Sequence, residues 1–122
     1  PIYHPNALAY TATTTALDEG GPWHSELIQY LRGNRDLIRD WLVHHKQVSW
    51  KNSEATYLAW LDFSQLGWNN VQEHLIKNGL ALSAGSQFGA EYSQFGRLNF
   101  GVPKATLIEA LKRIETAIKS SN

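Results

Sequence analysis

The sequence predicts an α/β fold, an α+β two-layer sandwich in which a small sheet of about three strands, mostly antiparallel or mixed, is covered by helices. Three observations favour this fold. The chain of 122 residues has 43% apolar residues, enough for one buried core. Two segments, 56–63 and 97–102, have the composition of strands, and the segment that follows Pro103 has helical periodicity. No internal repeat divides the chain, so a single domain is expected.

Two helices are expected before the first strand. Asn6 is a suitable N-cap for an alanine-rich helix that ends at about Leu17. Pro22 suits the first turn of a second helix. Gly33 in its middle costs about 1 kcal/mol relative to alanine, so we expect either a break or a close neighbour there. The apolar positions at helical spacing, expected to form a buried face, are Trp23, Leu27, Leu31, Ile38, Trp41 and His45.

The next segments alternate between strand and helix. Residues 56–63 are rich in strand formers and apolar on both faces, which predicts an internal strand covered on both sides. Asn69 or Asn70 can cap a short helix through Lys77, with Gly79 placed for a left-handed C-cap. A short strand over residues 80–83 is expected to follow.

The last strand and helix have the clearest patterns. In 97–102, apolar residues alternate with Arg97 and Asn99, so Arg97 should lie on the face opposite the apolar one. From Pro103 onward, helical spacing predicts a final helix with Glu109/Arg113 and Glu115/Lys119 as exposed i, i+4 pairs. Its apolar stripe is Leu107, Leu111, Ile114 and Ile118.

Composition excludes several classes of function. The 11 basic and 11 acidic residues balance and form no basic block, which argues against nucleic-acid and anionic-membrane partners. No cysteine is present, so disulfides and cysteine-based metal sites are excluded. The five histidines lack the spacing of a metal site, and no metal is expected. No apolar run approaches the roughly 18 residues of a membrane span, so a soluble protein is expected.

Arg97 is the strongest candidate for a functional side chain. It is the one charged residue of its strand, and its planar guanidinium matches a carboxylate or phosphate in two parallel hydrogen bonds. The alternative is a strand-edge arginine paired with a local Asp or Glu. Residues 85–89, bracketed by two glycines, could bind an anion through backbone N–H groups, but a tight turn is the favoured interpretation.

Five segments carry a further signal when they are taken together in order: 6–10 (NALAY), 23–36 (WHSELIQYLRGNRD), 54–62 (EATYLAWLD), 82–89 (LSAGSQFG) and 97–103 (RLNFGVP). They resemble the C-terminal part of class I/II aminotransferase-like enzymes that use pyridoxal 5'-phosphate (PLP). Within this family the resemblance is to the carbon–sulfur β-lyase branch, typified by cystathionine β-lyase and the maltose-regulon modulator.

The resemblance implies that residues 1–122 are the C-terminal small domain of a fold-type-I PLP enzyme. Residues 1–21 would be a helix leading in from a large domain that is absent here, and residues 22–122 would be the small-domain core. Arg97 would bind the α-carboxylate of the substrate. Tyr57, Gly85 and Ser86 lie in segments that resemble parts of the family's active site and are weaker candidates for substrate binding.

The family's catalytic and cofactor-binding residues are not expected in this chain. In the family, a lysine of the large domain binds PLP, and none of the six lysines here has that sequence context. The aspartate that pairs with the PLP ring nitrogen and the phosphate-binding loop are also missing. The chain is therefore expected to bind no cofactor and to be inactive alone.

The activity implied for the full-length enzyme is β-elimination from a sulfur amino acid such as cystathionine or cysteine, in a cytoplasmic homodimer. The closest alternative is the same domain of a PLP-dependent aminotransferase. A second alternative is a free-standing, non-catalytic module that binds a carboxylate or a partner protein. The absence of methionine, including an initiator, favours an excised or processed piece of a longer protein.

Overall fold

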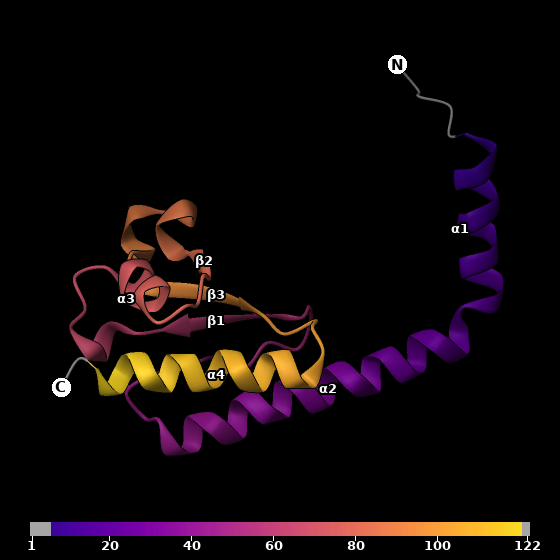
Figure 1. Ribbon diagram of the computed structural model, residues 1–122. Helices are drawn as coiled ribbons and strands as arrows, with labels where there is room; N and C mark the ends of the chain where they lie inside the picture. The colour runs from indigo at the N-terminus through magenta and orange to yellow at the C-terminus, as the bar shows by residue number, and fades with distance from the viewer. Residues whose placement is uncertain (1–5, 121–122) are drawn as a thin grey trace. The chain divides into compact units, whose positions relative to one another are not determined.

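The computed structural model of the chain describes residues 6–120. The helices are α1 (Ala7–Glu19), α2 (Gly21–His44), α3 (Val71–Lys77) and α4 (Lys104–Lys119), and the strands are β1 (Leu58–Asp62), β2 (Ser83–Ala84) and β3 (Phe95–Asn99) (Figure 1). Short 3-10 helices cover Ser64–Leu66 (η1), Gly85–Phe88 (η2) and Ala90–Tyr92 (η3). The chain divides into two compact units, residues 1–32 and 33–122. The sequence predicts a division after residue 21, which is earlier than the boundary after residue 32. Residues 1–5 of the predicted lead-in segment lie outside the described residues.

The first unit contains α1 and the start of α2. As predicted, Asn6 caps α1, and its Oδ1 accepts a hydrogen bond of 2.8 Å from the backbone N–H of Ala9. No residue of α1 is buried. Trp23 in α2 is 67% exposed. Of the six positions predicted to form a buried face, only Ile38 is buried, and the partly buried ones are Leu27, Leu31, Trp41 and His45. The predicted buried face is therefore confirmed only at Ile38. Neither helix of this unit covers the Trp23 ring. Helical periodicity predicts which residues share a face of a helix, but it does not predict whether another element packs on that face.

The second half of α2 belongs to the larger unit and is held by a buried asparagine. The predicted break or close neighbour at Gly33 is wrong, because α2 continues through it and, apart from its chain neighbours and its own helix backbone, no described atom lies within 4 Å of where its Cβ would be. Asn34 is 1% exposed, and its Nδ2 donates hydrogen bonds of 2.9 Å to both Phe100 O and Val102 O. Bonds to a segment 66 and 68 residues away therefore anchor this part of α2.

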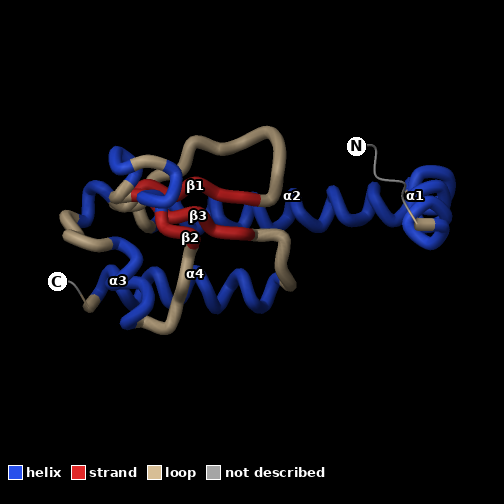
Figure 2. The backbone as a smooth tube through the Cα atoms, turned by 90° about the horizontal axis from the view of Figure 1, so that it is seen from above, coloured by secondary structure: helices blue, strands red, loops and turns tan. Residues whose placement is uncertain are grey.

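The sheet has three antiparallel strands in the order β1-β3-β2, which confirms the predicted small sheet (Figure 2). The prediction that residues 56–63 form an internal strand is wrong: β1 lies at the edge, and among the described residues its outer side pairs only at Ser49–Asp62. Only Ala59 and Leu61 of β1 are buried. The two later strands are displaced from 80–83 and 97–102, because β2 pairs with β3 only through Ser83–Ala84 and β3 pairs with β1 through residues 95–99.

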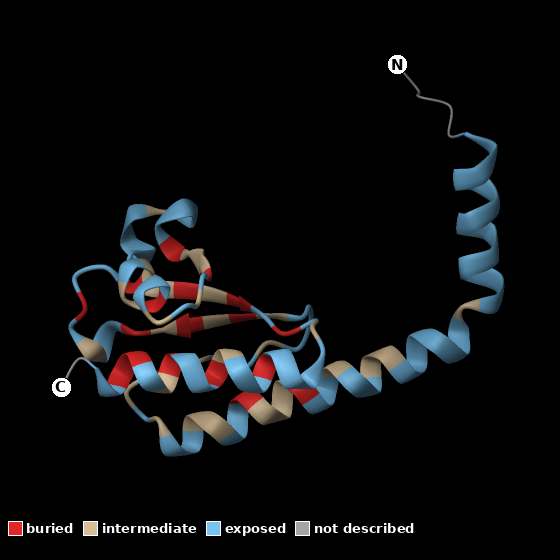
Figure 3. Cartoon of the chain, in the orientation of Figure 1, coloured by how far each residue is buried: buried red, intermediate tan, exposed pale blue. Residues whose placement is uncertain are grey.

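One face of the sheet packs on helices and forms the core. Alternate residues of β1 and β3, including Leu61 and Leu98, join Ile38 of α2 and Leu75 of α3 in one buried cluster. The predicted stripe of α4 faces the same core, and all four of its residues are buried (Figure 3). The four residues are Leu107, Leu111, Ile114 and Ile118. The predicted sandwich of a small sheet and covering helices is thus confirmed.

Local signals placed α3 correctly. The Asn70 side chain accepts a hydrogen bond of 3.1 Å from the Glu73 backbone N–H at the start of the helix. Gly79 follows the helix with φ of 74°, a backbone conformation that favours glycine. Within residues 6–120, no helix has both the length and the apolar composition needed to cross a lipid bilayer.

Candidate functional site

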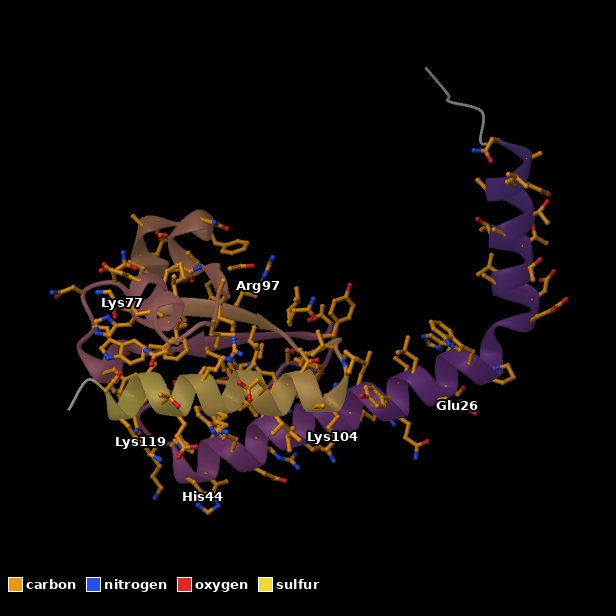
Figure 4. All side chains as sticks on the ribbon, in the orientation of Figure 1. Glu26, His44, Lys77, Arg97, Lys104 and Lys119 are labelled. Carbon is orange, nitrogen blue, oxygen red and sulfur yellow. The ribbon has the colours of Figure 1, made fainter. Side chains whose placement is uncertain are left out.

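Arg97 lies on the central strand of the sheet. Its neighbours along β3, Gly96 and Leu98, are buried in the core, whereas Arg97 is half-buried. Antiparallel pairing places Trp60 of β1 on one side of Arg97 and Ser83 of β2 on the other. The Arg97 side chain points away from α4, on the face of the sheet opposite the helical layer (Figure 4). Strand alternation therefore separates this cation from the core.

The guanidinium of Arg97 has an aromatic ring and a hydroxyl as its close neighbours. The carbon Cζ lies 4.7 Å from the centre of the Phe88 ring. Nη2 donates a long hydrogen bond of 3.4 Å to Ser83 Oγ. Within residues 6–120, no Asp or Glu oxygen lies within 4.0 Å of Arg97, so the pairing with a local acid considered above is not found there. Among the described residues, the Phe88 ring and the Ser83 hydroxyl are thus the close neighbours of this positive charge.

Four rings beside Arg97 form what we call the aromatic cluster: Trp60, Phe88, Tyr92 and Phe95. Trp60 is its centre, stacked on Phe95 at 5.6 Å between centroids. Phe88 and Tyr92 meet Trp60 edge to face at 5.2 Å and 5.7 Å. These geometries are favourable for aromatic pairs. The cluster explains why β1 is apolar on its second face, where the sequence suggested a second covering layer.

The glycine-bracketed loop forms the turn that carries Phe88. Residues 85–88 are the 3-10 helix η2, which agrees with the favoured interpretation of a turn. Gly85 is buried, and a Cβ there would lie 2.1 Å from Tyr92 O and 2.7 Å from Phe95 O. Packing therefore requires a glycine at position 85. Ser86 is exposed on the same turn.

The structure brings some of the predicted site residues together and leaves one apart. Gly85 and Ser86 share η2 with Phe88, which contacts Arg97. Tyr57 precedes β1, is 49% exposed, and its ring packs over Gly101, where a Cβ would lie 3.1 Å from ring carbons. Tyr57 is thus not a core residue, and it is not one of the two residues that contact the Arg97 guanidinium, Phe88 and Ser83.

The residues that sequence analysis missed are Phe88, Trp60 and Ser83. All three lie in or beside quoted motifs, but only strand register and the fold of η2 bring them to Arg97. Phe88, an aromatic residue three positions after Gly85, is the one feature of the sequence that could have indicated this neighbour of Arg97.

The lysines of the chain lie off the strands and the turn that surround Arg97. No lysine lies on β1, β2, β3 or η2. Lys104, Lys112 and Lys119 are on α4, in the helical layer across the sheet. In residues 6–120, no three His, Asp or Glu side chains gather where they could hold a metal ion.

The resolved pKa shifts belong to the helices and not to this face. Hydrogen bonds from Lys77 and Arg113 lower the pKa values of Glu73 on α3 and Glu109 on α4, respectively. A hydrogen bond from Lys119 likewise lowers the pKa of Glu115 on α4. Glu73 and Glu109 are exposed and Glu115 is partly exposed, and each carboxylate is paired one helical turn away.

Comparison of sequences finds relatives that are much longer than this chain. No family model matches it. It is 38% identical over 117 residues to cystathionine beta-lyase PatB of Bacillus subtilis, an alignment that covers 93% of this chain and 30% of PatB. It is 34% identical over 120 residues to protein MalY of Escherichia coli, covering 95% of this chain and 31% of MalY. The chain thus spans about a third of the length of these curated relatives.

Comparison of structures also finds longer proteins, of which this chain covers about a third. Cystalysin of Treponema denticola, which contains a PLP cofactor, matches with a TM-score of 0.88 and 28% identity over 96% of this chain and 31% of its own. OvoB matches with a TM-score of 0.88 and 37% identity, over 97% of this chain and 31% of its own. N-succinyldiaminopimelate aminotransferase of Mycobacterium tuberculosis matches with a TM-score of 0.75 and 26% identity, over 88% of this chain and 29% of its own.

Proposed function

We propose that this chain, which is homologous to cystathionine β-lyases and MalY over about a third of their length, is the small domain of a PLP-dependent carbon–sulfur β-lyase. The resemblance indicated by the five sequence segments is confirmed by these relatives. Residues 1–21 lead in from the large domain in this proposal, and residues 22–122 form the small-domain core. The full-length protein is a cytoplasmic homodimer that acts on a sulfur amino acid, and PLP is bound mainly by the large domain.

The observation that carries the proposal is the position of Arg97. Its guanidinium stands on the central strand, on the sheet face away from the helices, and no described carboxylate lies within 4.0 Å of it. An arginine can hold a carboxylate with two parallel, charge-assisted hydrogen bonds. Its role in this proposal is to bind and orient the α-carboxylate of an amino acid.

Orientation is the chemical contribution of this domain. PLP, when bound, supplies an electron sink that makes an α-C–H bond of an amino acid easier to break. A two-point contact at Arg97 fixes the direction of that bond, and holding the geometry in advance lowers the entropic part of the barrier. Trp60 and Phe88 provide an apolar wall beside the cation. Gly85 and Ser86 act as substrate-binding residues from η2, and Tyr57 acts from the end of the sheet.

The overall reaction balances without a further reactant beyond water. Elimination breaks the Cβ–S bond of cystathionine, and hydrolysis of the remaining three-carbon unit gives homocysteine, pyruvate and ammonia. An aminotransferase remains the second candidate, because an aminotransferase shares the fold with a TM-score of 0.75. That enzyme would require a keto-acid acceptor and release no thiol.

The test is an assay of the full-length protein that contains this chain, loaded with PLP and supplied with cystathionine. Thiol, pyruvate and ammonia formed without an added keto acid would support the lyase. Turnover that requires a keto acid would instead identify the protein as an aminotransferase. If the full-length protein binds no PLP, the remaining interpretation is a module that binds a carboxylate or a partner protein.

A substitution then tests the role of Arg97. Arg97→Ala should lower kcat/KM by an amount equivalent to about 3 kcal/mol or more, because a charge-assisted bidentate contact is lost. An unchanged kcat/KM would show that Arg97 does not bind the substrate carboxylate and has a structural role instead. This chain by itself, without the large domain, should show no stoichiometric imine absorption when mixed with PLP.

A further inference from the structure

We infer that Phe88 is a positioning residue for Arg97: its ring holds the guanidinium in the plane from which it donates hydrogen bonds to a substrate carboxylate. This inference rests on the proposed function and adds to it a residue whose side chain has no polar atom. The Phe88 ring centre lies 4.7 Å from Arg97 Cζ, within the range of a cation–π contact.

A contact through the face of the Phe88 ring does not require the N–H donors of the Arg97 guanidinium. A guanidinium donates all its N–H groups in its own plane, whereas an aromatic ring attracts the cation through a face. Phe88 can therefore restrain Arg97 without occupying the donors that a carboxylate needs. The one polar contact of the guanidinium is the 3.4 Å hydrogen bond to Ser83 Oγ among the described residues, a length at which such bonds are weak. Phe88 is thus the stronger of the two restraints.

Phe88 is itself held in place from two sides. Its ring meets Trp60 edge to face, with centroids 5.2 Å apart and planes at 87°. Trp60 is in turn stacked on Phe95, with planes at 16°. The backbone that carries Phe88 begins at Gly85, which is packed against two carbonyl oxygens with no room for a side chain. A ring fixed in this way can transmit its orientation to Arg97.

The exposure of Phe88 indicates that its ring contributes little to the hydrophobic core. Phe88 is 47% exposed, far more than the core aromatic Phe63, which is fully buried. Replacing Phe88 should therefore disturb Arg97 more than it disturbs folding. Tyr92 offers a matched control, since it is 37% exposed and also meets Trp60 edge to face, whereas the ring that contacts Arg97 is Phe88.

The test measures ligand binding to the PLP-loaded full-length protein, with L-alanine and its amide, L-alaninamide, as probes. The readout is the ratio of the two dissociation constants, because only L-alanine carries the carboxylate. Phe88→Leu should weaken L-alanine binding about two- to fivefold, the equivalent of a cation–π contact at an exposed site, and leave L-alaninamide unchanged. Phe88→Tyr should restore the wild-type ratio, and Tyr92→Leu should retain it.

The outcomes separate this inference from the proposed function. If Arg97→Ala abolishes the preference for L-alanine and Phe88→Leu leaves it intact, the inference about Phe88 is wrong and the carboxylate role of Arg97 stands. If Arg97→Ala also leaves the preference intact, the proposed function itself is wrong. Equal weakening of both ligands by Phe88→Leu, or a failure of Phe88→Tyr to restore the ratio, would also overturn the positioning role.

Discussion

Asn34 provides the sharpest test of how α2 is attached to the sheet. Its Nδ2 donates to Phe100 O and Val102 O, each at 2.9 Å, and the residue is 1% exposed. Asn34→Leu keeps a similar volume but removes both donors. Each hydrogen bond contributes about 1 kcal/mol, and each carbonyl left without a partner away from water adds a penalty, so we expect a loss of roughly 2–4 kcal/mol in the free energy of unfolding.

The assay is urea unfolding followed by tryptophan fluorescence. The loss should appear as a lower midpoint with an unchanged m-value, since the native surface changes little. Asn69 is an exposed asparagine, and Asn69→Leu is the control, expected to change the free energy of unfolding by less than about 0.5 kcal/mol. A loss below about 1 kcal/mol for Asn34→Leu would refute the reasoning that these two bonds hold α2.

The aspartate variant adds a pH dependence with a defined sign. In Asn34→Asp, an ionised carboxylate would face two carbonyl oxygens and could donate to neither. Burial and these oxygens would raise the pKa of the introduced carboxyl in the folded state. The variant should therefore be most stable at acidic pH, where the group is protonated in both states, and should lose stability as the pH rises from the ordinary carboxyl range through the raised pKa. A pH profile parallel to that of the wild type would contradict this account.

Three further outcomes are expected for the folded chain. Gly85→Ala should destabilise it by about 1–3 kcal/mol in urea unfolding, because the new Cβ would lie 2.1 Å from Tyr92 O; unchanged stability would show that η2 shifts freely. Ile114→Ala should cost about 2–5 kcal/mol in the same assay, since Ile114 is fully buried in the core; a loss under about 1 kcal/mol would mean that the core collapses around the deletion. Lys119 lowers the pKa of Glu115, so the pair supports folding above the ordinary carboxyl range and loses that support as the pH falls through the lowered pKa. Lys119→Met should therefore flatten the acid limb of the stability profile, and an equally steep limb would argue against the pair.

The elements that sequence analysis located correctly are those whose signals are local. Asn6 and Asn70 cap their helices with side chains that reach only three residues along the chain. Gly79 adopts a positive φ directly after α3. The apolar stripe of α4 follows from a period of 3.6 residues, which the helix itself imposes. Short-range rules decide such features, so one sequence is enough to predict them.

The candidate site was only partly predictable for the opposite reason. Strand alternation indicated that Arg97 lies across the sheet from the core, and it does. Its neighbours Ser83 and Phe88 are 14 and 9 positions away in the sequence, and only the pairing of β2 with β3 and the turn at η2 bring them close. Register is set by which strands pair and how the loops between them fold, and apolar alternation does not specify either.

The amino-acid sequence by itself determined the class of fold, the positions of the helix caps, the buried stripe of α4 and the face on which Arg97 lies. Tertiary structure alone decided that β1 is an edge strand, that α2 passes through Gly33 without a break, and that Asn34 bonds to Phe100 and Val102. The physical reason is range: propensity, capping and periodicity act within one or two turns of chain. The Asn34 hydrogen bonds join residues 66 and 68 positions apart, and strand order depends on the pairing of residues 58–62 and 83–84 with residues 95–99. These segments meet only when the core closes.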